Sequence, residues 1–533
     1  MISRLDRLAP ALFSGLAALF ILLVLVKIFT SFDAVPYWDM YDGQLAFYSR
    51  FTNGDWSALW ESHNEHRIAL TKLAFLIDFN LLDGTTRFLW YLNFVLAALI
   101  ALVLVAFLRQ MPSGATFVWM PAFLVAVSFS ELQKENFYWS FQSQFFLVYL
   151  LPLAALYFAL LSLTQPKRTT VYFVTSTGLG ILSVGTMANG IFALPVLTAY
   201  ALLTRMSWQR VALLAVLSVI GFLAYFHGLP EKVDQPSALQ ILTQSPLKFI
   251  RYWLTYLGNP FRPANKIVAA LAGLALVVLA VRVAWKHIPR GRASAAEIAL
   301  LGFMGYIFLT ALVTAIGRVP LGVNQAMSGR YATPNLMNWC VLAMLCLPWL
   351  SASPMRAVKA TRAFLVILLL LFVVQLSALR PDKKATDRLG AALALELGIP
   401  DQDQVIHVYP KAELALQIVD RFRSDPKAIF AMFPIKDVGD LIGTRTSAAI
   451  SSCADPAFKS TAVPRTTWSR VNGPVLPDQG QQLLISDDAG LIRGVAVQGR
   501  LGTIGYLQSG PTVPLYIGTE VSRCGPLAFG PSP

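Results

Sequence analysis

The chain is organised around residues 34–70, AVPYWDMYDGQLAFYSRFTNGDWSALWESHNEHRIAL, a polar stretch that follows an apolar run from Leu8 to Thr30. The apolar run is long enough to cross a bilayer. The stretch after it mixes carboxylates and basic groups with Tyr and Trp. Aromatic rings favour headgroup depth, and charged groups near a membrane face water-filled cavities. We therefore expect this stretch to lie at a membrane–water boundary and to carry the site.

Composition places the chain among polytopic α-helical membrane proteins. Of its 533 residues 56% are hydrophobic and 14% are charged, whereas about a quarter of the residues of a soluble protein are charged. The first apolar run is too long for the core of a cleaved signal peptide. Apolar runs predict eleven membrane spans, at about 8–31, 88–108, 115–130, 144–164, 170–187, 190–204, 210–227, 266–285, 296–316, 331–350 and 362–380.

The net charge of +14 lies almost entirely before residue 380, because the remainder of the chain carries 16 basic and 15 acidic residues. Basic residues occupy alternate short loops, which is the positive-inside pattern and excludes a nucleic-acid partner. The N-terminus is then expected in the cytoplasm. Loops 32–87, 131–143, 228–265 and 317–330 and the C-terminal region are expected outside. Residues 70–88 and 246–263 are predicted to form amphipathic helices in the interface.

The C-terminal region reads as soluble structure. Residues 381–446 are predicted to form an α/β region with a strand at 405–410, VIHVYP, and residues 447–533 a small β-sandwich. Cys453 and Cys524 bracket the sandwich and are predicted to form a disulfide in an oxidising compartment. No Cys or His spacing supports a structural zinc site.

Two carboxylates follow the first span, in the order Asp39-Met40-Tyr41-Asp42. A carboxylate in this position is suited to deprotonate an acceptor hydroxyl. The alternative is that either residue caps a helix or a turn.

Three further segments carry candidate binding residues. HNEHR, residues 63–67, could bind a phosphate or a sugar hydroxyl, or form a solvated helix face. The segment 130–146 looks like a carbohydrate surface or an aromatic belt. Arg330, at the start of span ten, could bind a lipid-linked phosphate or pair with an acidic loop residue. The candidates are Glu65, His66, Arg67, Glu135, Asn136, Gln142, Arg330 and Tyr331; two histidines, His63 and His66, make a weak case for a metal.

Taken in this order, the elements resemble the GT-C superfamily of glycosyltransferases that use polyprenyl-phosphate sugars. Those proteins have an acidic residue just after helix one, often a second one in the next external loop, and many have a soluble periplasmic C-terminal domain. Asp39 matches the first acidic position, and Glu135 or Glu131 the second. The resemblance covers residues 1–380. This chain departs from the pattern because its first two acids are three residues apart, so either Asp39 or Asp42 fits the base.

The resemblance implies a bacterial inner-membrane enzyme that transfers a sugar, with inversion, from a polyprenyl-phosphate donor to a glycan, lipid or protein acceptor on the periplasmic side. Asp39 would be the general base, Arg330 and Arg67 would hold the donor phosphate, and Glu135 would orient a substrate. No cofactor is implied, and a divalent metal has no support in the residues. The alternatives are an O-antigen polymerase or ligase, which should concentrate arginines outside, and a transporter, which should place polar residues within its spans.

Overall fold

The chain folds as two compact units, and the first loop contributes to both. The computed structural model describes residues 4–111, 117–229, 238–287, 293–422, 424–451, 457–476, 480–508 and 513–530. The helical unit comprises Met1–Thr30, Trp60–Thr71 and Leu89–Arg380, and the mixed unit comprises Ser31–Leu59, Lys72–Phe88 and Pro381–Pro533. The sequence predicted that loop 32–87 belongs with the membrane helices. In the structure most of this loop packs with the C-terminal residues instead.

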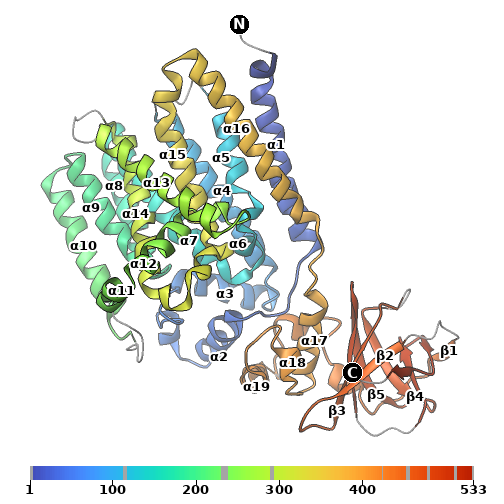
Figure 1. Ribbon diagram of the computed structural model, residues 1–533. Coiled ribbons are helices and arrows are strands. Elements are labelled where there is room, and N and C mark those ends of the chain that lie inside the picture. Colours follow the sequence, from blue (N-terminus) through green and yellow to red (C-terminus); the bar gives the residue numbers. More distant parts are fainter. Residues whose placement is uncertain are drawn as a thin grey trace. The chain divides into compact units, whose positions relative to one another are not determined.

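The helical unit is a bundle in which α1 and α16 pack side by side, as do α7, α8, α9 and α14 (Figure 1). Shorter helices, α6 (Lys134–Tyr138), α11 (Ala238–Gln244) and α12 (Pro246–Leu257), lie in its loops. The long elements are α1 (Arg4–Thr30), α4 (Arg87–Arg109), α5 (Met120–Ser128), α7 (Ser143–Thr164), α8 (Thr169–Ser183), α9 (Ala193–Leu203), α10 (Trp208–Phe226), α13 (Lys266–His287), α14 (Ala295–Arg318), α15 (Ala332–Ser351) and α16 (Pro354–Gln375).

Seven of these helices, within the described residues, are long and apolar enough to cross a membrane: α1, α4, α7, α10, α13, α14 and α16. The other four predicted spans also coincide with helices. With 15 residues α8 would reach only about 22 Å, less than the ~30 Å hydrocarbon core, and α5 and α9 are shorter still. The fourth, α15, is long enough but buries Thr333, Asn335 and Asn338. By length and composition, seven of the eleven predicted spans thus meet both criteria, and the structure is mostly helical as predicted.

One end of the helical unit gathers the polar loops. The Gln375 amide, near the end of α16, donates to Phe20 O of α1 (3.2 Å) and to Phe129 O after α5 (3.1 Å). Its carbonyl oxygen accepts a bond from the Glu131 backbone N–H (2.8 Å). The turn that holds Lys167 joins α7 to α8 at the other end of these helices, since it follows the full length of α7 (Figure 1). We call the end that holds Glu131 the polar end.

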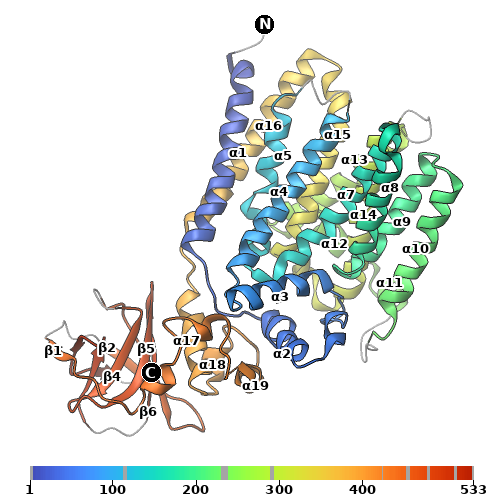
Figure 2. The same cartoon turned by 180° about the vertical axis from the view of Figure 1, so that it is seen from behind.

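The mixed unit joins most of the first loop to residues 381–530. Arg388 bonds Asp33 (2.6 Å) and Asp382 (2.7 Å), so the start of the loop is fixed to the C-terminal region. Tyr48 of α2 stacks on Phe79 of α3 with 4.3 Å between ring centroids, and the two helices lie next to each other in Figure 2. Its helical elements are η1 (Tyr41–Ala46), a π-helix, α2 (Phe47–Thr52), α3 (Ala69–Leu82, shared with the helical unit), α17 (Ala385–Glu396), α18 (Gln402–Val405), α19 (Ala412–Val419) and α20 (Val438–Leu441).

The sequence also predicts helices at 382–397 and 411–423, and α17 and α19 confirm them, but the strand predicted at 405–410 is wrong. Residues 402–405 form α18 and the chain then turns. Asp401 starts this helix because its side chain accepts the Gln404 backbone N–H (3.3 Å). The described residues between 381 and 446 therefore contain helices and turns, without a strand.

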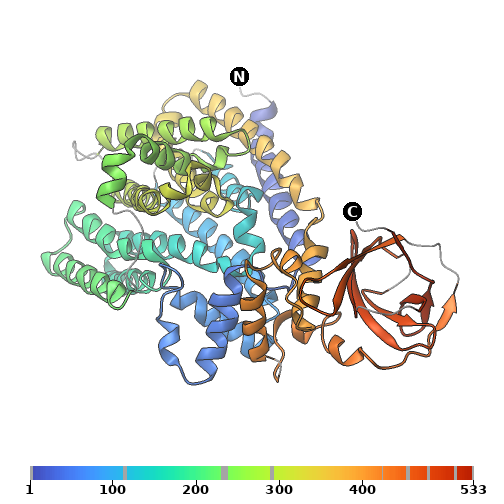
Figure 3. The ribbon, with the colours of Figure 1, turned by 60° about the horizontal axis from the view of Figure 1, so that its bottom comes forward.

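Nine strands form one continuous, strongly curved sheet in the order β1-β8-β7-β4-β5-β6-β3-β2-β9 (Figure 3). The sequence predicted four of these strands, within residues 482–521, as part of a small sandwich. Pairing is antiparallel except between β1 and β8 and between β2 and β9. The strands are β1 (Ala449–Ser451), β2 (Ala457–Ala462), β3 (Trp468–Gly473), β4 (Gln482–Asp487), β5 (Ile492–Gly499), β6 (Gly502–Gln508), β7 (Leu515–Gly518), β8 (Ser522–Cys524) and β9 (Ala528–Gly530).

The core of the sheet is apolar, with Phe458, Leu483 and Ile485 fully buried. Helix α17 packs on β5 and β6 so closely that a Cβ on Gly390 would come within 2.8 Å of an Ile504 methyl group. Cys524 in β8 is disulfide-bonded. Cys453, its predicted partner, lies outside the described residues. Cys340 and Cys346 of α15 are free.

Candidate functional site

Two arginines and two glutamates form the charged part of the polar end. The first pair joins Arg330, which follows the Gly329 turn, to Glu135 of α6, with 3.8 Å between Nε and Oε1. The Arg330 backbone N–H also donates to Glu135 Oε2 (3.1 Å), and its Nε–H donates to Ser328 Oγ (3.1 Å). Pairing with an acidic loop residue, one of the two predictions for Arg330, is confirmed.

The GRY segment brings its backbone against the Glu135 carboxylate. A Cβ on Gly329 would stand 2.6 Å from Glu135 Oε2, so a larger residue there would displace the carboxylate.

Three polar side chains hold this segment in place. The Asn136 amide donates to Arg330 O (2.9 Å) and to Thr333 Oγ1 (2.8 Å). The Thr333 hydroxyl in turn donates to Gln133 Oε1 (2.6 Å). Asn136 is fully buried, so the structure places it between loop and helix rather than on a surface that could meet a sugar. Gln142 is also buried.

The second ion pair was not foreseen. Arg318, the last residue of α14, donates from Nη2 to Glu65 Oε1 (3.0 Å). The side chains of Arg318 and Glu65 are 31% and 32% exposed, and those of Arg330 and Glu135 are 28% and 31% exposed. Both pairs are therefore within reach of a ligand.

Tyr252 of α12 is close enough to both arginines for their charges to act on its hydroxyl. Its ring is fully buried, and burial raises the pKa of its hydroxyl, while the charges of Arg318 and Arg330 oppose that rise. Both guanidinium groups thus act on one hydroxyl. Tyr331, another predicted residue, is buried and packs against Tyr256, with 4.6 Å between ring centroids.

A third arginine, Arg262, lies near Gly329 and Glu135. Its guanidinium donates to Asn259 Oδ1 (2.8 Å) and to Leu132 O. Burial lowers the pKa of this arginine, and the nearby charge of Glu135 opposes the shift. The cluster therefore contains three guanidinium groups and two carboxylates, which leaves it with a net positive charge.

Arg67, predicted to bind phosphate, holds the end of α10 instead. Its Nε–H donates to Tyr225 O (2.7 Å), Nη1 donates to Trp60 O (2.5 Å), and Nη2 donates to His227 O. The side chain is buried. Two of its donors bind carbonyl groups at the C-terminal end of α10, where the helix dipole is negative. His66 Nδ1 accepts from the Ala188 backbone N–H (3.4 Å). Among the described residues, no cluster of three His, Cys, Asp or Glu side chains could hold a metal.

Asp39 and Asp42 belong to the mixed unit, at the start of the π-helix η1. Asp42 is exposed, and its Oδ2 accepts the Tyr409 hydroxyl (2.7 Å). Asp39 is half-buried. Burial raises the pKa of Tyr409, and the hydrogen bond to Asp42 and the charge of Asp39 add to the shift. π-Helices are rare and concentrate at functional sites. The presence of η1 therefore favours a functional role for the segment that holds Asp39 and Asp42.

No protein-family model, curated protein or solved structure matches this chain. Its chemistry must therefore be argued from the two groups of residues described above. Arg318 and Arg262 were missed because each lies at the end of a helix, and Tyr252 because it is one of several aromatic residues in α12. The arginines at 262, 318 and 330 share one signal: each lies in or next to a loop that the sequence predicts to be external, where positive charge is unusual.

Proposed function

We propose that this chain is a membrane glycosyltransferase of the GT-C type, which moves a sugar from a polyprenyl-phosphate donor to a cell-envelope glycan, lipid or protein. The observation that carries the proposal is a pair of partly exposed arginines, Arg318 and Arg330, whose charges both act on Tyr252. Each is anchored to a glutamate through one nitrogen. Within the described structure, Nη1 and Nη2 of Arg330 and Nε and Nη1 of Arg318 make no hydrogen bond. Such donors suit phosphate oxygens.

The proposed reaction is a displacement at the anomeric carbon of the donor sugar. The acceptor hydroxyl loses its proton as its oxygen forms the new glycosidic bond, and the proton goes to Asp39, which we assign as the base from the sequence resemblance and not from its placement. The bond between the anomeric carbon and the phosphate oxygen breaks, and polyprenyl phosphate leaves. Arg318 and Arg330 stabilise the negative charge that develops on the leaving phosphate. Glu65 and Glu135 orient the arginines.

Binding of polyprenyl phosphate, without a sugar, tests the arginine site directly. Arg318→Gln and Arg330→Gln are each expected to weaken this binding to purified protein in nanodiscs by about tenfold to 100-fold, since a hydrogen bond to a charged group contributes about 1.5–3 kcal/mol. Arg330→Lys keeps the positive charge but loses the planar guanidinium group, so its affinity for polyprenyl phosphate should lie between those of wild type and Arg330→Gln. Arg168→Gln, on the basic loop after α7, is the matched control. Unchanged binding in the Arg318→Gln/Arg330→Gln double variant would remove the basis of the proposal.

The same arginines favour a second candidate, a polymerase or ligase that takes an assembled glycan from a polyprenyl diphosphate. The loops looked poor in arginine along the sequence, yet the fold brings Arg262, Arg318 and Arg330 to one end. A diphosphate carries more negative charge to balance them. The products distinguish the two candidates, because a sugar transferase adds one residue per turnover and a polymerase or ligase adds a preassembled block.

We further propose that the polar end and the mixed unit face the periplasm. The exposed apolar ridge of α3 (Leu73, Ile77 and Leu81) is typical of a helix that rests in the interface. Reporter fusions after Arg109 and Arg205 should report the cytoplasm, and a fusion after Arg380 the periplasm. A cytoplasmic signal from the last fusion would place the donor site on the wrong side for a periplasmic acceptor.

A further inference from the structure

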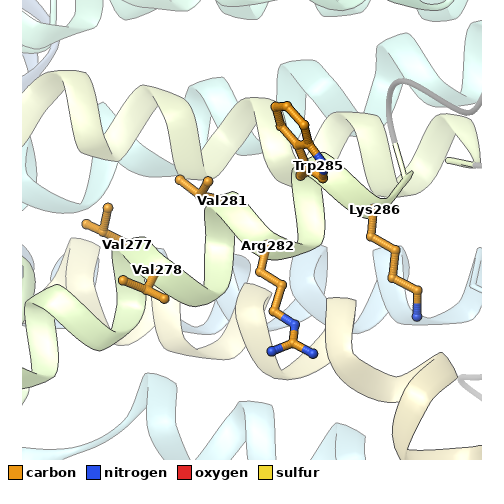
Figure 4. A pocket seen from close by; sticks show the side chains of 6 residues that line it. All are labelled: Val277, Val278, Val281, Arg282, Trp285 and Lys286. Carbon is orange, nitrogen blue, oxygen red and sulfur yellow. The ribbon is translucent and has the colours of Figure 1, made fainter.

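The last turns of α13 form two neighbouring ridges on the outside of the helical unit. Val277, Val281 and Trp285 follow one another at four-residue spacing, and Val278, Arg282 and Lys286 form the adjacent ridge (Figure 4). Toward the C-terminal end of α13, one ridge ends in Trp285 and the other in Arg282 and Lys286. The helix surface therefore changes from apolar to cationic within three turns.

These six side chains line a groove of about 500 Å³. Trp285 is 76% exposed, and Val278 and Val281 are each more than half exposed. Val277 and Lys286 are nine residues apart, which corresponds to about 14 Å along the helix. That length is close to half of the ~30 Å hydrocarbon core, or one leaflet.

The two cations of the groove have no anionic partner in the described protein. Neither Arg282 nor Lys286 makes a hydrogen bond or an ion pair with a described residue, and no acidic side chain lines the groove. Basic residues in the last turn of a helix favour its dipole, and long side chains reach toward the headgroups. Those effects explain the charges by themselves, but not a valine-lined groove that leads to them beside an exposed tryptophan.

We propose that this groove binds an anionic phospholipid of the surrounding membrane. Its phosphate would lie between Arg282 and Lys286, and one acyl chain would lie along Val277, Val278 and Val281. Basic pockets on membrane helices bind anionic headgroups in this way. Because α13 begins next to Arg262 and the groove is at its far end, this lipid site is separate from the arginines of the polar end.

Lipid retention tests the site without reference to catalysis. Protein in mixed micelles is titrated with phosphatidylglycerol or phosphatidylcholine, and bound lipid is counted by native mass spectrometry. Wild type should retain phosphatidylglycerol preferentially. Arg282→Gln/Lys286→Gln should bind it about 30-fold more weakly, because each cation near an anionic surface contributes about fivefold. Val278→Trp, which fills the groove without changing the charge, should also reduce retention.

The matched control is Lys167→Gln/Arg168→Gln, which removes two exposed charges from another basic loop and should leave retention unchanged. Gel filtration and melting temperature confirm that each variant is folded. Equal retention of the two lipids by wild type would overturn the proposal. So would equal phosphatidylglycerol binding by wild type and Arg282→Gln/Lys286→Gln, or an equal loss in the control. If Val278→Trp retained as much phosphatidylglycerol as wild type, the lipid would be held by the surface charges alone and not in the groove, which would also overturn the proposal.

Discussion

Replacing Asp39 by Asn is expected to lower glycan transfer by about 10²–10⁴-fold, the usual contribution of a general base. Asn keeps the size of the side chain and much of its hydrogen bonding, so the protein should still fold and insert. Only the ability to accept the acceptor's proton is lost. The measurement is the cell's glycan profile at matched abundance of the protein in the membrane.

Two other aspartates of the same loop provide the controls. Asp55 is exposed and paired with Arg50 (2.5 Å), so Asp55→Asn should leave transfer unchanged. Asp42→Asn should have a small effect if Asp42 serves chiefly to accept the Tyr409 hydroxyl. An unaltered glycan profile in the Asp39→Asn strain would contradict the assignment. Loss in Asp42→Asn alone would move the base three residues along the chain.

Replacing Asp401 by Ala is expected to destabilise the mixed unit by about 3–5 kcal/mol, because it leaves a mostly buried arginine without its counter-charge. Both oxygens of Asp401 accept bonds from Arg470 Nη1 (2.9 Å each). The Tyr506 hydroxyl donates to the same carboxylate (2.9 Å). The side chains of Arg470 and Asp401 are 16% and 3% exposed, so solvent can replace little of what is lost.

Hydrogen exchange of the full chain measures this effect, with faster exchange expected in β3, β6 and α18. Asp403→Ala, two residues away and exposed, should change little. Arg470→Met in the Asp401→Ala background should restore part of the stability, since it removes the unpaired charge. Equal protection in wild type and Asp401→Ala would show that the network contributes no net stability.

The sequence was sufficient for the membrane class because apolar length is a strong signal, and for α17, α19 and the strands because turns and periodicity mark them. It was misleading at 405–410, where β-branched residues suggested a strand. The side chain of Asp401 accepts a backbone N–H at the start of α18, just before this segment. This helix cap outweighs the weak strand propensity of residues 405–410. Likewise, the alternation of strands could not reveal that they join into one sheet, because pairing depends on distant partners.

The candidate site was predictable in its residue types but not in its partners. Arg67 has the chemistry of a phosphate ligand, yet its neighbours from α10 lie 158 and more residues away and occupy its donors. Glu65 looked like a sugar ligand, while its partner Arg318 is 253 residues distant. No local pattern encodes such pairs, so the site became visible only when the fold had brought them together.

The sharing of the first loop between the two units has a consequence for biosynthesis. Asp33 and Arg388, which bond each other, are 355 residues apart. At about 5–20 residues per second, a ribosome needs about 20–70 s to cover that distance. The segment with Asp39 and Asp42 is therefore synthesised early and waits without its packing partners until the end of the chain follows. Ribosome stalling or premature termination after the last span would thus yield a full set of membrane helices whose first loop never matures, which makes this loop a natural target for proteolytic quality control.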